Sequence, residues 1–202
     1  MLKVFVGENS FAIKRAIESV VNSSSLVAEY IDGEAINAAD LANTLLGGTL
    51  FASQRLIIIR DLSANSQAWS ALPDYIKGLA EDDSIVILVE TKLDKRSKTY
   101  KSLAKAVEIQ EFAPLSPRDI GSQLNWLESE SKQIGLTIDT RTLRHLLLRV
   151  GPDQWRLVSA LEKLKLKGEV TVEIIDASKD LQSVADQVWN ILSKMPILGS
   201  RE

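Results

Sequence analysis

Two wholly apolar runs constrain the fold of this chain more than any other feature. The first is RLIIIRDL at residues 55–62, and the second is SIVILVE at residues 84–90. Because neither run alternates between apolar and polar residues along its core, both faces of each strand must be buried. Strands of this kind are typical of the interior of a parallel sheet that helices cover on both sides. We therefore predict an α/β protein built around these two strands.

Further strand-like and helix-like segments alternate around the two apolar runs. The remaining strands are predicted at residues 2–6, 25–31 and 107–112. Helices are predicted between the strands, at residues 10–21, 38–46, 66–80 and 97–106. Pro73 lies inside the third of these helices and should kink or split it, because proline lacks the N–H that a helix interior needs. Strands separated by helices in this way predict a parallel sheet with right-handed crossovers.

The second half of the chain is predicted to be helical. Helices are expected at residues 118–134, 139–150 and 153–166. The first of them should have Ser116 as its N-cap and Pro117 in its first helical position. Residues 171–180 fit either a strand or a short helix, and residues 182–195 form a further amphipathic pattern. The predicted domains are an α/β domain at 1–115, a small helical domain at 116–178 and the start of another helical domain at 179–202.

Composition and charge exclude several classes of function. The net charge of -3 argues against a protein that binds nucleic acid or an anionic membrane with its whole surface. The absence of cysteine excludes disulfides, thiolate chemistry and cysteine-based zinc sites, and the only histidine, His145, is expected to be structural. The start of the chain lacks the features of a signal peptide, and no apolar run approaches the roughly 20 residues that span a bilayer. We predict a cytoplasmic protein with no metal, no cofactor and no membrane partner.

The turn after the first predicted strand is where a nucleotide-binding α/β domain carries its phosphate loop. Such a loop reads G-x-x-x-x-G-K-[ST], because backbone N–H groups hold the phosphates and the lysine reaches the terminal ones. In GENSFAIKR, which begins at Gly7, Ala12 and Ile13 stand in place of the second glycine and the lysine, and Lys14 comes one residue late. We therefore predict that the chain is not an enzyme and hydrolyses no ATP. Glu90 ends the second apolar run, and we interpret it as a solvated acid rather than as a Mg²⁺ ligand.

Basic side chains are concentrated in KLDKRSKTYKSLAK, residues 92–105, where the one acid is Asp94. The candidate contacts to DNA or to a partner subunit are Lys92, Lys95, Arg96, Lys98 and Lys101, followed by Lys105 at the end of the stretch. Several phosphate contacts from such a patch would give a salt-dependent affinity for DNA. The alternative is a solvated basic loop and helix face, and the sequence leaves both interpretations open.

The segment GGTLF, residues 47–51, places Leu50 and Phe51 after two glycines and before the strand that would bury them. Either the pair folds back onto the sheet as a satellite of the core, or it is offered to an apolar pocket of a partner. We interpret Gly47 and Gly48 as a flexible hinge ahead of the pair. Burying both side chains in a partner would contribute roughly 3–6 kcal/mol, whereas micromolar affinity needs about 8 kcal/mol. The surrounding surface would therefore have to contribute as well.

Four stretches of the sequence resemble the delta subunit of the bacterial DNA polymerase III clamp loader. They are VFVGENSF, GGTLFASQRLIII, SIVILVETKLDKRSKTYKSL leading to EFAPLSP, and LRHLLLRVGPDQWRLVSALEKLKL followed by EVTVEIID. The combination of TLFASQRL with KLDKRSKTYKSL is the most specific part, and the similarity extends over roughly residues 2–175. The resemblance implies a RecA-like, AAA+-type parallel sheet with a degenerate nucleotide site, followed by a small all-helical lid domain.

The resemblance also implies a function and a set of partners. In that family, a Leu-Phe pair ahead of the central strand inserts into a hydrophobic pocket of the ring-shaped sliding clamp, and the subunit opens one interface of the ring. By matching, the clamp-binding residues of this chain are Leu50 and Phe51, supported by Thr49, Ala52 and Ser53. The implied partners are the sliding clamp (the beta subunit) and the gamma/tau and delta prime subunits of the loader, with DNA as a further candidate.

Members of the family continue into a third helical domain that forms a collar between the loader subunits. The resemblance therefore implies that residues 179–202 are the truncated start of that collar domain. Two functions from different classes follow from the sequence. The first is a non-catalytic clamp-loader subunit that binds and opens the sliding clamp. The alternative is a DNA-binding module that uses the basic stretch 92–105 without binding the clamp.

Overall fold

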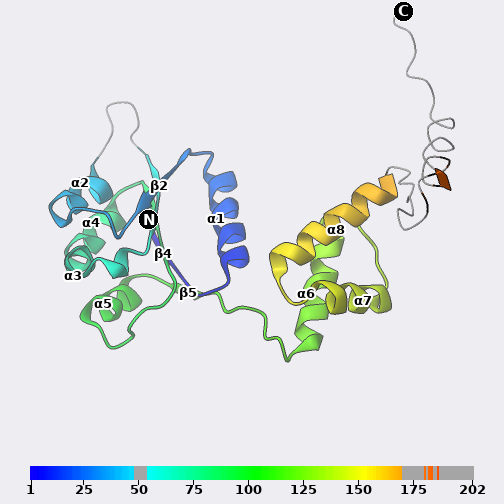
Figure 1. Ribbon diagram of the computed structural model, residues 1–202. Coiled ribbons are helices and arrows are strands. Elements are labelled where there is room, and N and C mark those ends of the chain that lie inside the picture. Colours follow the sequence, from blue (N-terminus) through cyan, green and yellow to red (C-terminus); the bar gives the residue numbers. More distant parts are fainter. Residues whose placement is uncertain (48–53, 170–179, 181, 184–185, 187–202) are drawn as a thin grey trace, which may run out of the picture. The chain divides into compact units, whose positions relative to one another are not determined.

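The computed structural model describes residues 1–47, 54–169, 180, 182–183 and 186 of the chain (Figure 1). Two compact units are present, Met1–Ser122 and Gln123–Glu202. Each unit has a hydrophobic core of its own. Within the described residues, no helix combines the length and the apolar character that crossing a membrane would require.

The first unit is built on a parallel sheet with the strand order β2-β3-β4-β1-β5. The strands are β1 (Leu2–Val6), β2 (Ala28–Asp32), β3 (Leu56–Arg60), β4 (Ile85–Glu90) and β5 (Ile109–Glu111). The two apolar runs form the adjacent interior strands β3 and β4, with Leu56 paired to Ile85. Leu56 to Ile59 have no exposed surface. The predicted parallel sheet and its two apolar interior strands are therefore confirmed.

Helices cover both faces of this sheet, as Figure 1 shows. They are α1 (Ser10–Ser24), η1 (Ala38–Asp40), α2 (Leu41–Leu46), η2 (Leu62–Ala64), α3 (Ser66–Ala71), η3 (Leu72–Tyr75), α4 (Ile76–Glu81) and α5 (Lys98–Ala106). Side chains of a strand point alternately to opposite faces. Leu56 and Ile58 accordingly pack with the residues of α1, whereas Ile57 and Ile59 pack with those of α2 to α5. The interior strands are therefore apolar throughout because both of their faces are covered.

Pro73 splits the third predicted helix, as expected. The α-helical hydrogen bonding of α3 ends at Ala71, the 3₁₀ turn η3 contains the proline, and α4 begins at Ile76. Proline has no N–H to donate to the preceding turn, so the regular ladder cannot continue through it. The two halves still bury Leu72 and Leu79 in the core of the first unit.

The second unit contains a three-helix arrangement. The helices are α6 (Ile120–Gln133), which starts just ahead of the boundary between the units, α7 (Thr140–Val150) and α8 (Gln154–Glu169). Their shared core consists of Leu124, Leu127, Leu143, Leu147, Leu157 and Leu161. Asp139 caps α7 with its carboxylate, and Gly151 ends that helix with a positive φ of 84°. His145 lies exposed on α7, and its structural role stays a prediction.

The start of α6 differs from the prediction. Ser116 is not the N-cap, because residues 116–119 form a turn in which the N–H of Asp119 donates to the carbonyl of Ser116 at 3.1 Å. Pro117 occupies the second position of that turn, where its fixed φ is favourable. The helix begins after Asp119, whose carboxylate accepts from the N–H of Ser122 at 2.9 Å. Ser116 therefore starts the turn, and Asp119, three residues later, caps the helix.

Candidate functional site

Because all strands are parallel, the sheet has one edge formed by strand beginnings and another formed by strand ends. We call them the amino edge and the carboxyl edge. The segment that carries the predicted clamp-binding residues connects α2 to the beginning of β3, so it joins the sheet at the amino edge. Thr49, Leu50, Phe51, Ala52 and Ser53 themselves lie outside the described residues. The structure describes the two flanks of this segment.

The upstream flank is the end of α2, which is anchored in the core. Leu41 and Leu45 of this helix are 0% and 1% exposed. The N–H of Gly47 donates to the carbonyl of Asn43 at 2.9 Å. A Cβ atom on Gly47 would lie only 2.2 Å from that carbonyl oxygen. Glycine suits position 47 because its backbone lies close to the carbonyl of Asn43 in the last turn of α2. Gly48, the other residue of the predicted hinge, lies outside the described residues.

The downstream flank is Arg55, which binds both the sheet and the upstream flank. Its Nε and Nη2 donate to the two carboxylate oxygens of Glu29 on β2, at 2.9 and 2.7 Å. Its Nη1 donates to the carbonyl of Gly47 at 2.5 Å and to that of Thr44 at 3.3 Å. This guanidinium hydrogen bond lowers the pKa of Glu29, and the same contact raises the pKa of Arg55. The two flanks are thus joined directly by one side chain.

The backbone of Arg55 is bound at the same edge. Its N–H donates to the hydroxyl of Ser84, at 3.2 Å, just ahead of β4. The N–H of Ser84 donates in turn to the carboxylate of Asp82 at 2.6 Å. Hydrogen bonds from Ser84 lower the pKa of Asp82. The amino edge between α4 and β3 is therefore closed by a short chain of hydrogen bonds.

At the carboxyl edge, the chain's own groups occupy the place of a phosphate loop. The connection from β1 to α1 consists of Gly7, Glu8 and Asn9. A Cβ atom on Gly7 would lie 2.1 Å from the carbonyl oxygen of Phe112, so this glycine permits a close backbone contact. The N–H of Asn9 donates to the same carbonyl at 3.2 Å, and its side-chain oxygen accepts from the N–H of Ala12 at 3.0 Å. These donors at the start of α1 are thus already satisfied within the protein.

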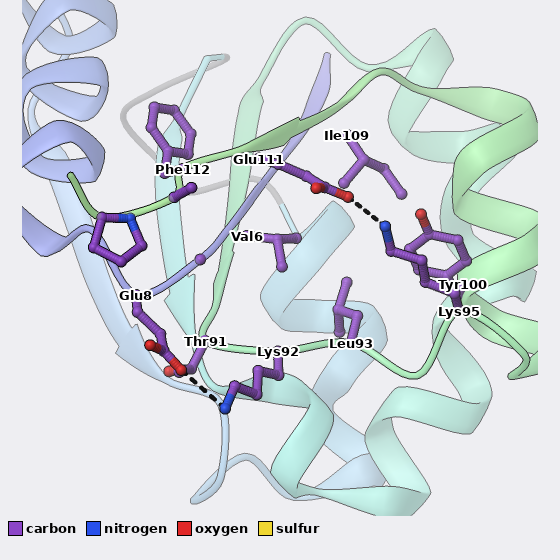
Figure 2. A pocket seen from close by; sticks show the side chains of 13 residues that line it. Val6, Glu8, Thr91, Lys92, Leu93, Lys95, Tyr100, Ile109, Glu111 and Phe112 are labelled. Carbon is purple, nitrogen blue, oxygen red and sulfur yellow. Dashed lines mark hydrogen bonds and ion pairs between the residues drawn. The ribbon is translucent and has the colours of Figure 1, made fainter. Parts of the chain in front are cut away.

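A shallow groove of about 390 Å³ lies next to this connection (Figure 2). Apolar side chains from β1, β5 and the loop after β4 line it, including Val6, Leu93 and Ile109. Two ion pairs also line it, Lys92 with Glu8 at 2.9 Å and Lys95 with Glu111 at 2.6 Å. All four charged side chains are more than half exposed, so water and salt screen both pairs. The groove is therefore apolar with a rim of balanced charge.

The predicted basic stretch divides into two groups. In the first group, Lys92 and Lys95 pair with carboxylates across the groove, and Nε of Arg96 lies 3.2 Å from the carboxylate of Asp94. The second group consists of Lys98, Lys101 and Lys105, which are exposed on α5. In the described part of the chain, this second group makes no ion pair with an acidic side chain. Among the described residues, the lysines of the stretch that lack an ion pair are therefore those on α5.

Glu90 is not the solvated acid that the sequence suggested. Its side chain ends β4 and is buried, with 1% of the residue exposed. Its carboxylate accepts from the N–H of Ser63 at 3.1 Å and from the hydroxyl of Ser63 at 2.5 Å. Burial raises the pKa of Glu90. The carboxylate therefore secures the turn η2 after β3, which explains an acid at the end of a buried strand.

Two positions that sequence reasoning missed, Arg55 and Glu29, belong to the amino edge. The only signal in the sequence was a charged residue directly ahead of an apolar run, which is also common at ordinary strand ends. Glu29 lies 26 residues earlier in the chain, and nothing in the local pattern pairs it with Arg55. The parallel register of β2 and β3 brings the two together.

The fold is similar to that of known solved structures. The DNA clamp loader delta protein of Bacillus subtilis matches with a TM-score of 0.62 at 15% identity, over 97% of this chain and 68% of that one. A RuvB mutant of Thermotoga maritima matches with a TM-score of 0.54 at 10% identity, over 94% of this chain and 62% of that one. The chain thus shares with these structures an α/β fold in which a parallel sheet of five strands is followed by helices.

The particular family follows from the sequence of the first unit. A family model described as DNA polymerase III, delta subunit, matches residues 4–112, which is more than half of the chain. The matched range contains the segment TLFASQRL and both of its described flanks. The chain belongs to the DNA polymerase III delta subunit family, and the resemblance seen in the sequence is confirmed. A search of curated proteins found no match to the chain.

Proposed function

We propose that this chain is a delta-type clamp-loader subunit that binds the sliding clamp and opens its ring for loading onto primed DNA. The observation that carries the proposal is membership of the delta family through a match that contains TLFASQRL. Leu50 and Phe51 are the proposed clamp-binding residues, with Thr49, Ala52 and Ser53 as supporting contacts. The well-bonded flanks of this segment support the proposal, because a fixed base reduces the entropy lost on binding.

Ring opening places a further requirement on the subunit. A ligand shifts an equilibrium only by the difference between its affinities for the two states. The subunit must therefore bind the open clamp more tightly than the closed clamp. The apolar pair alone supplies attraction to a pocket, so residues around the segment have to provide the preference for the open ring.

We propose further that the chain supplies no nucleotide chemistry of its own. Phosphate loops bind through free backbone N–H groups at a helix N-terminus. At the corresponding place in this chain, Asn9 caps α1, and its own N–H is bound to Phe112. The chain would then depend on ATPase partner subunits for its loading cycle in the cytoplasm, and the proposed loader partners are the gamma/tau and delta prime subunits. ATP with Mg²⁺ should accordingly leave the melting temperature unchanged, because a ligand raises it only by binding the folded state.

Clamp binding is tested by titrating the sliding clamp of the same organism with wild type and with the Leu50→Ala, Phe51→Ala double variant. We expect the folded double variant to bind about tenfold more weakly or worse, because it loses most of the apolar surface offered to the pocket. Leu148→Ala is the matched control, since this leucine of α7 is 74% exposed and lies in the second unit. Equal binding by wild type and the folded double variant would contradict the proposal.

One observation favours the alternative function, a DNA-binding module that uses the basic stretch 92–105 without binding the clamp. Lys98, Lys101 and Lys105 form an exposed cationic face on α5 without ion pairs to acidic side chains in the described structure. If this face contacts DNA phosphates, the affinity for duplex DNA should fall linearly on a logarithmic salt scale, with a slope of about 0.9 per contact. Replacing the three lysines by alanine should flatten that slope, whereas replacing the paired Lys95 and Arg96 should change it less.

A further inference from the structure

Arg55 is a charged residue whose side chain is largely buried. Its side chain is only 12% exposed, and the residue lies directly ahead of Leu56–Ile59 of β3, which have no exposed surface. Burying a charge is unfavourable unless the group is paired and hydrogen-bonded. An apolar residue would continue the buried run without that cost. The position of this guanidinium therefore calls for an explanation beyond sheet formation.

The contacts of Arg55 explain why a guanidinium is buried at this position. Its guanidinium makes a two-pronged interaction with the carboxylate of Glu29 and simultaneously donates to the carbonyls of Thr44 and Gly47. The planar fork of arginine suits this combination, because it presents several donors in one rigid plane. A lysine ammonium carries charge but cannot reproduce the fork. The arrangement thus uses a property that only arginine has among the natural side chains.

These contacts fix where the chain leaves α2 and where it enters β3. Gly47 and Arg55 are eight residues apart in sequence, yet a single hydrogen bond of 2.5 Å joins them. Gly47 is also held by its own N–H on the carbonyl of Asn43. Glu29 lies on β2, so the anchor of the whole arrangement is the sheet itself. The two flanks of residues 48–53 therefore have a defined separation that depends on one side chain.

We infer that Arg55 is a positioning residue for partner binding at the amino edge: it holds the end of α2 and the start of β3 together, so that these two flanks need not be ordered when a partner binds. The inference rests on the proposed clamp-binding function. Rigidifying a binding segment in advance increases affinity by lowering this cost. Arg55 acts through the segment and does not itself need to touch the partner.

The first experiment compares clamp affinities of wild type, Arg55→Met, Arg55→Lys and Glu29→Gln, each at a temperature where circular dichroism shows it to be folded. Arg60→Met is the matched control, because Arg60 ends the same strand at the opposite edge. We expect Arg55→Met to bind about fivefold more weakly or worse and Glu29→Gln to lie between it and wild type, as each removes part of the anchor. Arg55→Lys should resemble Arg55→Met because the fork is lost, and Arg60→Met should bind like wild type.

A double-mutant cycle separates positioning from direct contact or from a general structural role. Arg55→Met is combined with Leu50→Ala and Phe51→Ala, and clamp binding is measured at raised clamp concentration. If Arg55 acts through the apolar pair, its replacement has no further effect on affinity in this background, although it still lowers the melting temperature. Additive effects on affinity would overturn the inference. Wild-type affinity of folded Arg55→Met and Glu29→Gln would overturn it too.

The proposed function and this inference fail in different ways. If the Leu50→Ala, Phe51→Ala variant binds the clamp as wild type does, the proposed function is wrong, and the inference falls with it. If that variant loses affinity while the Arg55 and Glu29 variants keep it, clamp binding through the pair stands and the positioning role alone is wrong. Should Arg55→Met not fold, Glu29→Gln carries the test, because it leaves the guanidinium and its two carbonyl contacts in place.

Discussion

The amino edge and the carboxyl edge of the sheet are built differently, although the same strands supply both. At the carboxyl edge, where parallel α/β folds usually bind ligands, the chain satisfies its own donors through Asn9, Phe112 and Glu90. At the amino edge, a largely buried guanidinium joins the end of α2 to the start of β3. The comparison shows that backbone donors at one edge of a sheet can be satisfied by the chain's own groups while a buried guanidinium braces the opposite edge.

The largest expected effect on the free energy of unfolding comes from replacing Gly7 at the carboxyl edge. Gly7→Ala should destabilise the protein by about 3 kcal/mol, because its φ is positive and the new Cβ would collide with the carbonyl of Phe112. Gly151→Ala is the matched control, since its φ is also positive but nothing lies within 4 Å, and it should cost about 1 kcal/mol. Urea denaturation measures both. Equal losses would mean that the close contact at Gly7 contributes nothing.

A smaller effect is expected at the amino edge. Arg55→Met should lower the free energy of unfolding by about 2 kcal/mol, because charge-assisted hydrogen bonds to Glu29 and two carbonyls are lost together. Arg60→Met loses only a cation–π contact with Tyr30, at 6.0 Å from the ring centre, and should cost about 0.5 kcal/mol. Thermal unfolding of the two variants checks this. If Arg60→Met lost more stability than Arg55→Met, the carboxyl end of β3 rather than its amino end would be the more strongly stabilised one.

The two edges should also respond oppositely to pH. Arg55 lowers the pKa of Glu29, so this group adds stability above its unfolded pKa of about 4.3 and loses it as the pH falls through the lower folded value. Burial raises the pKa of Glu90, so its contribution is most favourable below the unfolded pKa and declines as the pH rises through the higher folded value. Denaturation from pH 3 to pH 8 of Glu29→Gln and Glu90→Gln should reveal differences from wild type of opposite slope. If both differences from wild type changed with pH in the same direction, the predicted contrast between Glu29 and Glu90 would be wrong.

The smallest effect is expected at the rim of the groove. Lys92→Met and Lys95→Met remove ion pairs with Glu8 and Glu111 whose members are more than half exposed. Such pairs contribute little because solvent screens them. Thermal melts should coincide with that of wild type at both low and high salt. A salt-dependent drop in melting temperature would show that the carboxyl edge depends on these pairs after all.

Much of the fold was predictable because it depends on local patterns. The apolar runs at 55–62 and 84–90 require burial on both faces, and Pro73 cannot continue a helix, so the interior strands and the split helix follow directly. The start of α6 was less predictable. Ser116 and Asp119 are both good caps, and the choice between them depends on the turn that Pro117 favours.

The candidate site was predictable only in part, because its key contacts join residues far apart in the sequence. The motif TLFASQRL identified the segment, but Arg55, Glu29 and Gly47 acquire their roles through strand register and the end of α2. The sequence suggests a hinge at Gly47 and does not reveal the close backbone contact with Asn43. Glu90 was expected to be exposed because acidic side chains at strand ends are usually solvated. Here its carboxylate is buried and accepts hydrogen bonds from Ser63.

The most direct test of the account is amide hydrogen exchange of the folded chain with and without the sliding clamp of its own organism. Exchange rates report how strongly each backbone N–H is protected. If the amino edge is the binding surface, the clamp should slow exchange in residues 44–57 and leave residues 7–9 and 91–97 unchanged. Protection confined to residues 7–9 and 91–97 would place the clamp at the carboxyl edge and contradict the account.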